Sequence, residues 1–151
     1  MQKLQNEGRK PVVQTPTADS AVQAALSAVV ERWPKLVNDN EALLRRGRYL
    51  TTDIMIEIGT QPYYISIDRG RISAVQRGPI VMKSWSFAVR GGEDAWRKFW
   101  ERYPPPHFHD IFALAKQGAF RIDGDYQPLI TNLLYFKELL AAPRTLQAKV
   151  Q

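Results

Sequence analysis

The hydrophobic positions change their period twice along the chain, and this divides it into helical and extended parts. Apolar residues recur every three or four positions in residues 18–46, which predicts helices. They alternate with polar residues in 49–90, which predicts strands, and the helical period returns from residue 93. The resulting order is helices, several strands, two helices, one strand and a last helix. This order is typical of an α+β fold with helices packed on an antiparallel sheet.

The first helix is expected to begin near Ala18, where Thr17 or Asp19 can cap it. Pro34 is expected to interrupt it, because proline lacks the amide hydrogen and clashes with the preceding turn. A second helical piece then ends at Gly47. The apolar face of the first helix has intervals of four, three and four residues: Val22, Leu26, Val29 and Trp33.

The extended region contains four alternating runs joined by short turns. Asp68-Arg69-Gly70 is a hairpin signal, and Gly78-Pro79 ends the third run. Closely spaced strands of this kind predict an antiparallel meander. In the fourth run, alternation places Trp85 and Phe87 on one face of the sheet. The expected strands cover residues 49–58, 63–68, 71–77 and 83–90.

The C-terminal third predicts a helix that ends at Gly118, a short strand, the turn Asp123-Gly124-Asp125 and a long apolar helix over 126–141. One face of that last helix carries Leu129, Leu133, Phe136 and Leu140. A second apolar line, made of Tyr126, Ile130 and Leu134, widens this face beyond what a small sheet needs to cover. Such a helix suits either one wall of an apolar cavity or a filled core.

Composition favours one globular domain. The chain has 151 residues, of which 44% are hydrophobic and 11% aromatic. We expect a flexible N-terminal arm over 1–16, a single domain over 17–142 and a basic C-terminal tail over 143–151. The absence of cysteine excludes disulfides, thiolate metal sites and a cysteine nucleophile. No apolar run has the length of a signal peptide or a membrane span, so a cytoplasmic protein is expected.

The net charge of +6 lies largely at the two ends of the chain. Residues 1–10 and 143–151 each contribute +2, which leaves 16 basic and 14 acidic residues between them. A nearly balanced domain argues against a nucleic-acid partner, which needs a basic stripe on the fold itself. The basic ends suit a transient contact with an anionic membrane, although solvated tails are the simpler interpretation.

His107, His109 and Asp110 are the candidates for polar chemistry. A metal site needs three or four converging ligands, and capping of the following helix is the simpler role for His109 or Asp110. A histidine–acid pair acting as a general base remains as an enzyme hypothesis. The turn Asp123-Gly124-Asp125 lacks the spaced ligands of a calcium loop, and no phosphate-binding loop is present. No cofactor or metal is therefore expected.

Aromatic residues are concentrated in the second half of the chain, at core-facing spacings. They fit a packed core, or a pocket that is apolar throughout with few polar groups. Lipid pockets need little else, because burial contributes about 0.8 kcal/mol per methylene without directional contacts.

The run GAFRIDGDYQPLITNLLYFKELL resembles the sterol carrier protein type-two family. That family commonly shows a Gly-x-(aromatic or Leu)-x-Ile-x-Gly-Asp run before a closing apolar helix. The YYISIDRGRISAV hairpin matches as well, and so does Trp85-Ser86-Phe87 followed by Gly-Gly-Glu-Asp. The resemblance covers residues 18–142. The matching positions of the first run are Gly118, Phe120, Ile122, Gly124 and Asp125.

The resemblance implies a five-stranded, mostly antiparallel sheet with helices on one face, enclosing an apolar cavity. It implies non-catalytic binding, and transfer, of fatty acyl chains, sterols or isoprenoid lipids without a covalent cofactor. The ending AAPRTLQAKVQ lacks a peroxisomal Ser-Lys-Leu signal, which fits a bacterial-type stand-alone member with a ligand other than sterol. The expected cavity lining is Ile54, Ile56, Trp85, Phe87, Phe99, Phe112, Leu133 and Phe136.

Two other hypotheses remain. One is an accessory protein with a filled core that partners a lipid- or quinone-modifying enzyme through its surface. The other is an enzyme that uses His107, His109 and Asp110. The insert WERYPPPHFHD, which includes Pro104-Pro105-Pro106, lies outside the minimal domain of the family and suits either a lid or an extension of the aromatic core.

Overall fold

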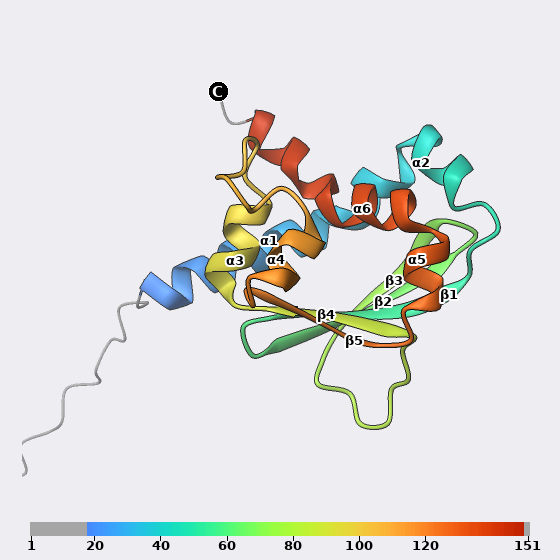
Figure 1. Cartoon of the computed structure of the whole chain (residues 1–151), viewed down its shortest axis with the longest axis horizontal. Coiled ribbons are helices and arrows are strands. Elements are labelled where there is room, and N and C mark those ends of the chain that lie inside the picture. The colour runs from blue at the N-terminus through green and yellow to red at the C-terminus, as the bar shows by residue number, and fades with distance from the viewer. Residues whose placement is uncertain (1–17, 150–151) are drawn as a thin grey trace, which may run out of the picture.

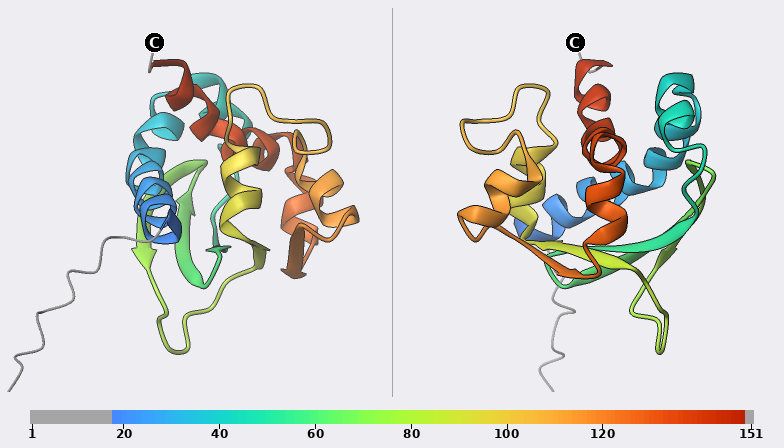
Figure 2. Two further views of the ribbon diagram at one scale, coloured as in Figure 1. Left: turned by 90° about the vertical axis from the view of Figure 1, so that its left-hand side faces the viewer. Right: turned by 45° about the vertical axis from the view of Figure 1, so that its right-hand side comes forward.

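The computed structural model describes residues 18–149, so the expected N-terminal arm over 1–16 lies outside the described residues. The helices lie on one side of the sheet and a single long loop lies on the other (Figures 1 and 2). None of the helices in this part of the chain is long and apolar enough to cross a membrane. The helices are α1 (Ala18–Asn38), α2 (Glu41–Arg46), α3 (Glu93–Phe99), α4 (Ile111–Lys116), α5 (Gln127–Thr131), α6 (Leu133–Ala141) and the 3₁₀ helix η1 (Ala142–Lys149).

The sheet has five strands in the order β3-β2-β1-β4-β5. Three pairs are antiparallel and β1 pairs with β4 in parallel, so the expected mostly antiparallel sheet is confirmed. The expected meander is wrong for β4, because the chain leaves β3 and crosses the helix-free face in residues 78–86 to reach β1 (Figure 1). The strands are β1 (Thr52–Ile58), β2 (Gln61–Asp68), β3 (Arg71–Arg77), β4 (Phe87–Gly91) and β5 (Phe120–Gly124).

The expected break at Pro34 is wrong, because α1 continues through it to Asn38. Trp33 and Val37 on either side of the proline are fully buried. Their packing outweighs the one hydrogen bond that proline cannot donate. The break comes at Asn40, whose side chain accepts a hydrogen bond from the Leu43 amide at 3.2 Å and caps α2.

The C-terminal helix is also divided. Asn132, with φ −119° and ψ 39°, separates α5 from α6, so the single helix expected over 126–141 is wrong. Both the backbone amide and the side-chain amide of Asn132 donate to the Pro128 carbonyl, at 3.2 and 3.1 Å. Asparagine side chains compete for backbone partners in this way and favour helix ends. The stop at Gly118 is confirmed, with φ +81° just after α4.

The sheet buries apolar side chains on both faces. Ile54 and Ile56 of β1 face the helices and belong to the main core, whereas Met55 lies in a second cluster with Tyr64 and Ala88. Trp85 packs against this second cluster. The expectation that Trp85 shares a face with Phe87 is therefore wrong, because β4 begins only at Phe87 and the residues before it are not in the strand.

Buried tryptophans join the helices to one another and to the sheet. The indole nitrogen of Trp33 donates to the Leu139 carbonyl at 2.8 Å, and that of Trp100 donates to the Leu140 carbonyl at 2.8 Å. Both carbonyls lie near the end of α6, where helices have unsatisfied acceptors. Hydrogen bonds of this kind are usual for buried tryptophans and fix α1 and the end of α3 against α6.

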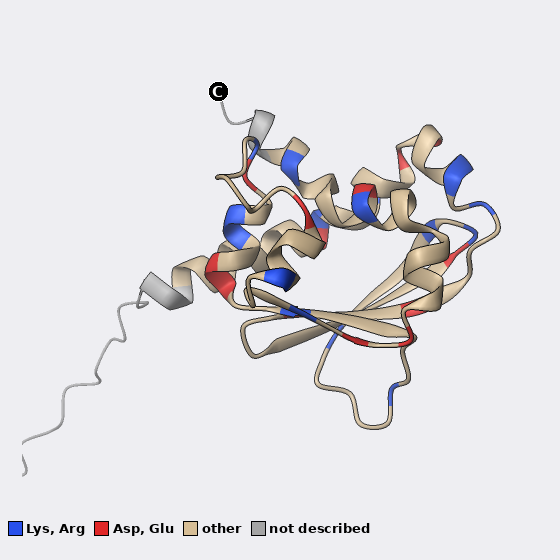
Figure 3. Cartoon of the chain, viewed as in Figure 1, with Lys and Arg blue, Asp and Glu red and all other residues tan. Residues whose placement is uncertain are grey.

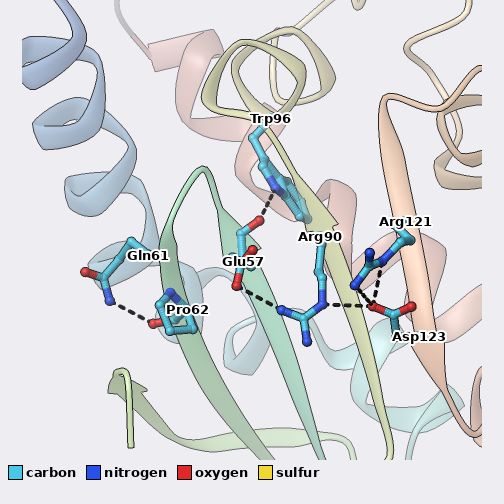
Figure 4. A network of polar contacts seen from close by, with 7 residues as sticks. All are labelled: Glu57, Gln61, Pro62, Arg90, Trp96, Arg121 and Asp123. Carbon is cyan, nitrogen blue, oxygen red and sulfur yellow. Dashed lines mark hydrogen bonds and ion pairs between the residues drawn. The ribbon is translucent and has the colours of Figure 1, made fainter.

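An ion-pair network joins three strands on the helix-free face (Figure 4). Arg90 of β4 pairs with Glu57 of β1 at 2.9 Å and with Asp123 of β5 at 2.8 Å. Arg121 shares the Asp123 carboxylate at 2.9 Å. Because Arg90 sits between both partners, it holds β5 and β1 to β4 through its side chain as well as through the ladder.

Removing the Tyr135 hydroxyl should destabilise the contact between α6 and the β2–β3 hairpin. The hydroxyl donates to the Gly70 carbonyl at 2.6 Å, and burial raises the pKa of Tyr135, which keeps it protonated. Tyr135→Phe should lower the free energy of unfolding by about 1–2 kcal/mol, because a buried acceptor loses its donor. Urea unfolding of this variant beside Tyr103→Phe, at an exposed ring, measures the difference; equal stability of both would contradict the role of the bond.

Candidate functional site

An apolar groove of about 400 Å³ lies between α4, β5 and α5. The strand β5 is at the edge of the sheet, and the two short helices flank it in sequence and in space (Figure 1). The groove is open to solvent along this edge. Its lining residues are Phe112, Ala115, Phe120, Arg121, Ile122, Tyr126, Leu129 and Ile130.

The alternation of β5 supplies the floor of the groove. Phe120 is buried and faces the core, and Leu129 of α5 is fully buried beside it. The Phe120 ring lies 4.5 Å from the Trp96 ring and 5.7 Å from the Phe99 ring, measured between centroids. The floor is therefore continuous with the aromatic part of the main core.

The rim of the groove is apolar and exposed. Tyr126, Ile130 and Leu134 have exposed fractions of 53%, 57% and 64%, and the first two line the groove directly. These residues form the second apolar line that the sequence shows on the C-terminal helices. Contiguous exposed apolar side chains beside a hollow are typical of a binding surface.

The polar groups at the groove are few and well placed. Arg121 is largely exposed and is the charged residue among those that line the groove; its guanidinium pairs with Asp123 at 2.9 Å. The Tyr126 hydroxyl donates to the Ile122 carbonyl at 2.6 Å, which fixes the ring across the edge of β5. Apolar walls with a small number of positioned polar groups are typical of sites for small molecules.

The structure distributes the expected cavity residues over four places. Phe112 lines the groove, Leu133 is partly buried at the start of α6, and Trp85 lies on the opposite face of the sheet. The other five are at most 1% exposed and pack in one core, where the Phe87 and Phe136 rings lie 4.9 Å apart. These five are Ile54, Ile56, Phe87, Phe99 and Phe136.

Sequence reasoning did not assign Ala115, Ile122 or Leu129 to a site. Ile122 fits an ordinary strand residue and Leu129 an ordinary core residue, so neither carries a separate signal. Tyr126 and Ile130 did carry one, because their line is wider than the sheet requires. An excess of apolar surface on a helix was therefore the best sequence indicator of the groove.

Asp110 has a structural role at the start of α4. One carboxylate oxygen accepts from the Phe112 amide at 2.9 Å and the other pairs with Lys137 at 2.8 Å, so the expected capping role of Asp110 is confirmed. His107 and His109 are both exposed. Within residues 18–149, no three histidine, aspartate or glutamate side chains cluster as metal ligands.

Asp110 should contribute stability that disappears in acid. Burial acts to raise the pKa of Asp110, but hydrogen bonds from Lys137 and from the Phe112 amide hold it below its ordinary value. The ionised form is thus favoured by folding, and its contribution is present above about pH 4 and lost as the pH falls through the lowered pKa. Asp110→Ala should cost about 1 kcal/mol at pH 7.

Thermal unfolding of the parent and of Asp110→Ala between pH 7 and pH 3 measures this effect. The difference between their melting temperatures should become smaller toward pH 3. Asp110→Asn is the matched control, since asparagine can cap a helix without the charge. A difference in melting temperature that stays constant over the whole pH range would contradict the role of the carboxylate.

Comparison with known proteins places the fold. No family model matches the chain, and no curated protein matches it in sequence. A crystal structure of sterol carrier protein 2 superposes with a TM-score of 0.61 at 12% identity, over 78% of this chain and 94% of that one. A Thermus thermophilus protein described as possibly a sterol carrier protein has a TM-score of 0.59 at 8% identity, over 82% and 90% of the two chains.

A third solved structure, the UbiJ-SCP2 ubiquinone synthesis protein, has a TM-score of 0.53 at 14% identity, over 82% of this chain and 93% of that one. The resemblance seen in the sequence is thereby confirmed at the level of the fold. The chain has the α+β architecture of sterol carrier protein type-two domains over most of its length.

Proposed function

We propose that this chain binds an apolar, lipid-type ligand in the groove between α4, β5 and α5, and that it does so without catalysing a reaction. The observation that carries the proposal is the apolar rim of Tyr126, Ile130 and Leu134 beside an apolar hollow. Each methylene of a ligand buried there contributes about 0.8 kcal/mol. A chain of several methylenes therefore binds without a cofactor or a directional contact.

The polar end of the ligand would lie at the mouth of the groove. Arg121 lines the groove at this edge of β5, with its guanidinium turned to Asp123 on the helix-free face, and the Tyr126 hydroxyl lies on the same edge. Guanidinium groups bind carboxylate and phosphate oxygens through paired hydrogen bonds. An acidic headgroup at the mouth would therefore have to share the Arg121 guanidinium with Asp123.

A longer ligand would have to pass Phe120 and Leu129 to reach the main core. The other expected lining residues on that side of the sheet, such as Phe87 and Phe136, take part in binding only for such a ligand. The break at Asn132 leaves α5 as a separate helix of five residues, so it can be displaced without moving α6. This is the point at which the groove would deepen into a tunnel.

The names of the structurally similar proteins support a lipid-type ligand. Two are described as sterol carrier proteins, certain or possible, and the third as a ubiquinone synthesis protein. The third name, together with the tightly packed core, also favours a second candidate function. In it the chain acts as an accessory to a quinone-modifying enzyme and uses the exposed line on α5 and α6 as a contact surface.

Native mass spectrometry of gently purified protein tests the first candidate. We expect a bound lipid, and uptake of a fluorescent fatty acid by the stripped protein. Recovery of ligand-free protein that takes up neither fatty acid nor isoprenoid quinone would sink the proposal and leave the accessory function. The double variant His107→Ala/His109→Ala should take up the probe as the parent does, since neither histidine lines the groove.

A further inference from the structure

The loop on the helix-free face carries an exposed apolar turn. Residues 78–86 hang away from the sheet on the side opposite the helices (Figures 1 and 2). Val81 and Met82 are 90% and 97% exposed, and Ile80 is 37% exposed. We call the three residues Ile80, Val81 and Met82 the tip.

The tip is a defined turn. The Lys83 amide donates to the Ile80 carbonyl at 3.4 Å, so Val81 and Met82 are the two central residues. Met82 has φ +61°, a conformation that turns normally give to glycine or asparagine at this position. Met82 is bulky, apolar, strained and almost wholly exposed, so it does not stabilise the folded monomer. This points to a role in contact with another molecule or surface.

Both ends of the loop are anchored to the sheet. At the first end, the Gly78 amide donates to the Pro62 carbonyl at 2.9 Å. At the second, the Ser86 amide donates to the Asp53 carbonyl at 2.8 Å, and Trp85 packs against Met55 and Ala88. The loop therefore holds the tip away from the sheet on a fixed base.

The charged residues of the loop and of the chain directly before and after it have one sign, whereas Asp53 and Asp125 lie at its base beside Ser86. From Arg69 to Gly92 the chain has five basic residues and no acidic one (Figure 3). Arg69 and Arg90 have acidic partners. Lys83, next to the tip, has none among residues 18–149. Arg77 at the end of β3 faces α1, and its Nε donates to the Gln61 side chain at 3.1 Å.

We infer that the tip inserts into the interfacial layer of an anionic phospholipid bilayer, with Lys83 against the lipid headgroups. Exposed apolar side chains next to a basic one are a combination that binds such surfaces. A protein partner fits less well, because a stable interface buries about 800 Å² per partner and two exposed side chains supply only a fraction of that area. This inference concerns a surface that faces away from the groove and does not depend on ligand binding.

Flotation with vesicles tests the inference. The full chain should float with phosphatidylcholine vesicles that contain about one-third phosphatidylglycerol, and less with phosphatidylcholine alone, because the Lys83 ammonium favours anionic headgroups. The variant Val81→Ser/Met82→Ser should bind the anionic vesicles about tenfold more weakly, since it removes the inserting apolar surface. Tyr49→Ser is the matched control, because Tyr49 is 87% exposed beside Arg48 and lies outside the loop.

A second measurement locates the contact. Because the chain has no cysteine, Val81→Cys and Tyr49→Cys each accept one environment-sensitive dye. The dye at 81 should shift to shorter wavelength with anionic vesicles, and the dye at 49 should not. Absence of vesicle binding by the parent, or equal binding by the double serine variant, would overturn the inference. So would concentration-dependent self-association that the double variant abolishes without vesicles, which would make the tip an interface between copies.

Discussion

Trp33→Ala should remove much of the stability of the fold. The Trp33 indole on α1 is completely buried against α6. It packs against the Trp100 ring in a T-shaped arrangement, with the ring centroids 5.8 Å apart. Truncating a buried tryptophan to alanine costs about 3–5 kcal/mol. The same change leaves the Leu139 carbonyl without its donor, which costs about 1–3 kcal/mol more. Against a total stability of about 5–15 kcal/mol for a domain, this variant should be close to unfolded at 37 °C.

Urea unfolding followed by circular dichroism measures the loss. Trp33→Phe helps to separate the two contributions, because it removes the donor but keeps much of the ring volume; it should cost clearly less than Trp33→Ala. Arg32→Ala, at the exposed neighbouring position, should change the stability by less than about 0.5 kcal/mol. A loss below about 1 kcal/mol for Trp33→Ala would mean that α6 does not depend on this contact.

The elements of the fold follow from local pattern, whereas their connections depend on contacts that the pattern does not contain. Apolar periodicity is enough to find the helices and strands, because each must bury one face. Pro34 stays inside α1 because Trp33 reaches Leu139, a contact between residues far apart in sequence. The parallel pairing of β4 with β1 likewise depends on the loop over residues 78–86, whereas sequence patterning predicts a short turn and a strand that already begins at residue 83.

The sequence predicts the class of ligand for the candidate site but not where the site lies in the fold. An apolar inventory with few polar groups indicates a lipid-type ligand wherever the residues lie. Which apolar residues pack and which stay accessible depends on the edge position of β5 and on the short helices beside it. Ile54 and Ile130 look alike in sequence, yet the first is fully buried under the helices and the second is 57% exposed on the groove rim.

The same reasoning applies to the tip. The run Ile80-Val81-Met82 follows Gly-Pro and falls between the expected strands over 71–77 and 83–90, so the sequence alone does not show whether it is buried. Only the crossing of the chain beneath the sheet places it in solvent. Exposed apolar residues thus occur at two separate places, the groove rim and the tip, and each can be altered without touching the other.

Ala115→Trp should block ligand uptake while leaving the fold intact. Ala115 lies on α4 and lines the groove, and its side chain is only partly buried, so an indole there projects into the hollow. If it displaces about three methylenes of a bound chain, the loss is about 2.4 kcal/mol, which is roughly a fiftyfold weaker affinity. The Kd for a fluorescent fatty acid, measured by titration, tests this expectation. Ala42→Trp, on the exposed side of α2, is the matched control and should bind as the parent does.

The outcome separates the groove from the other places where a ligand could enter. If Ala115→Trp binds the probe with the parent affinity, the ligand does not use the space between α4, β5 and α5, and the proposed site is wrong even if the protein binds lipid. If Ala115→Trp and Ala42→Trp both lose binding, the loss does not depend on the position of the tryptophan, and it does not support binding in the groove. A selective loss at residue 115, with vesicle binding by the tip unchanged, would establish that ligand and membrane contact different surfaces of the same sheet, because the groove and the tip share no residue.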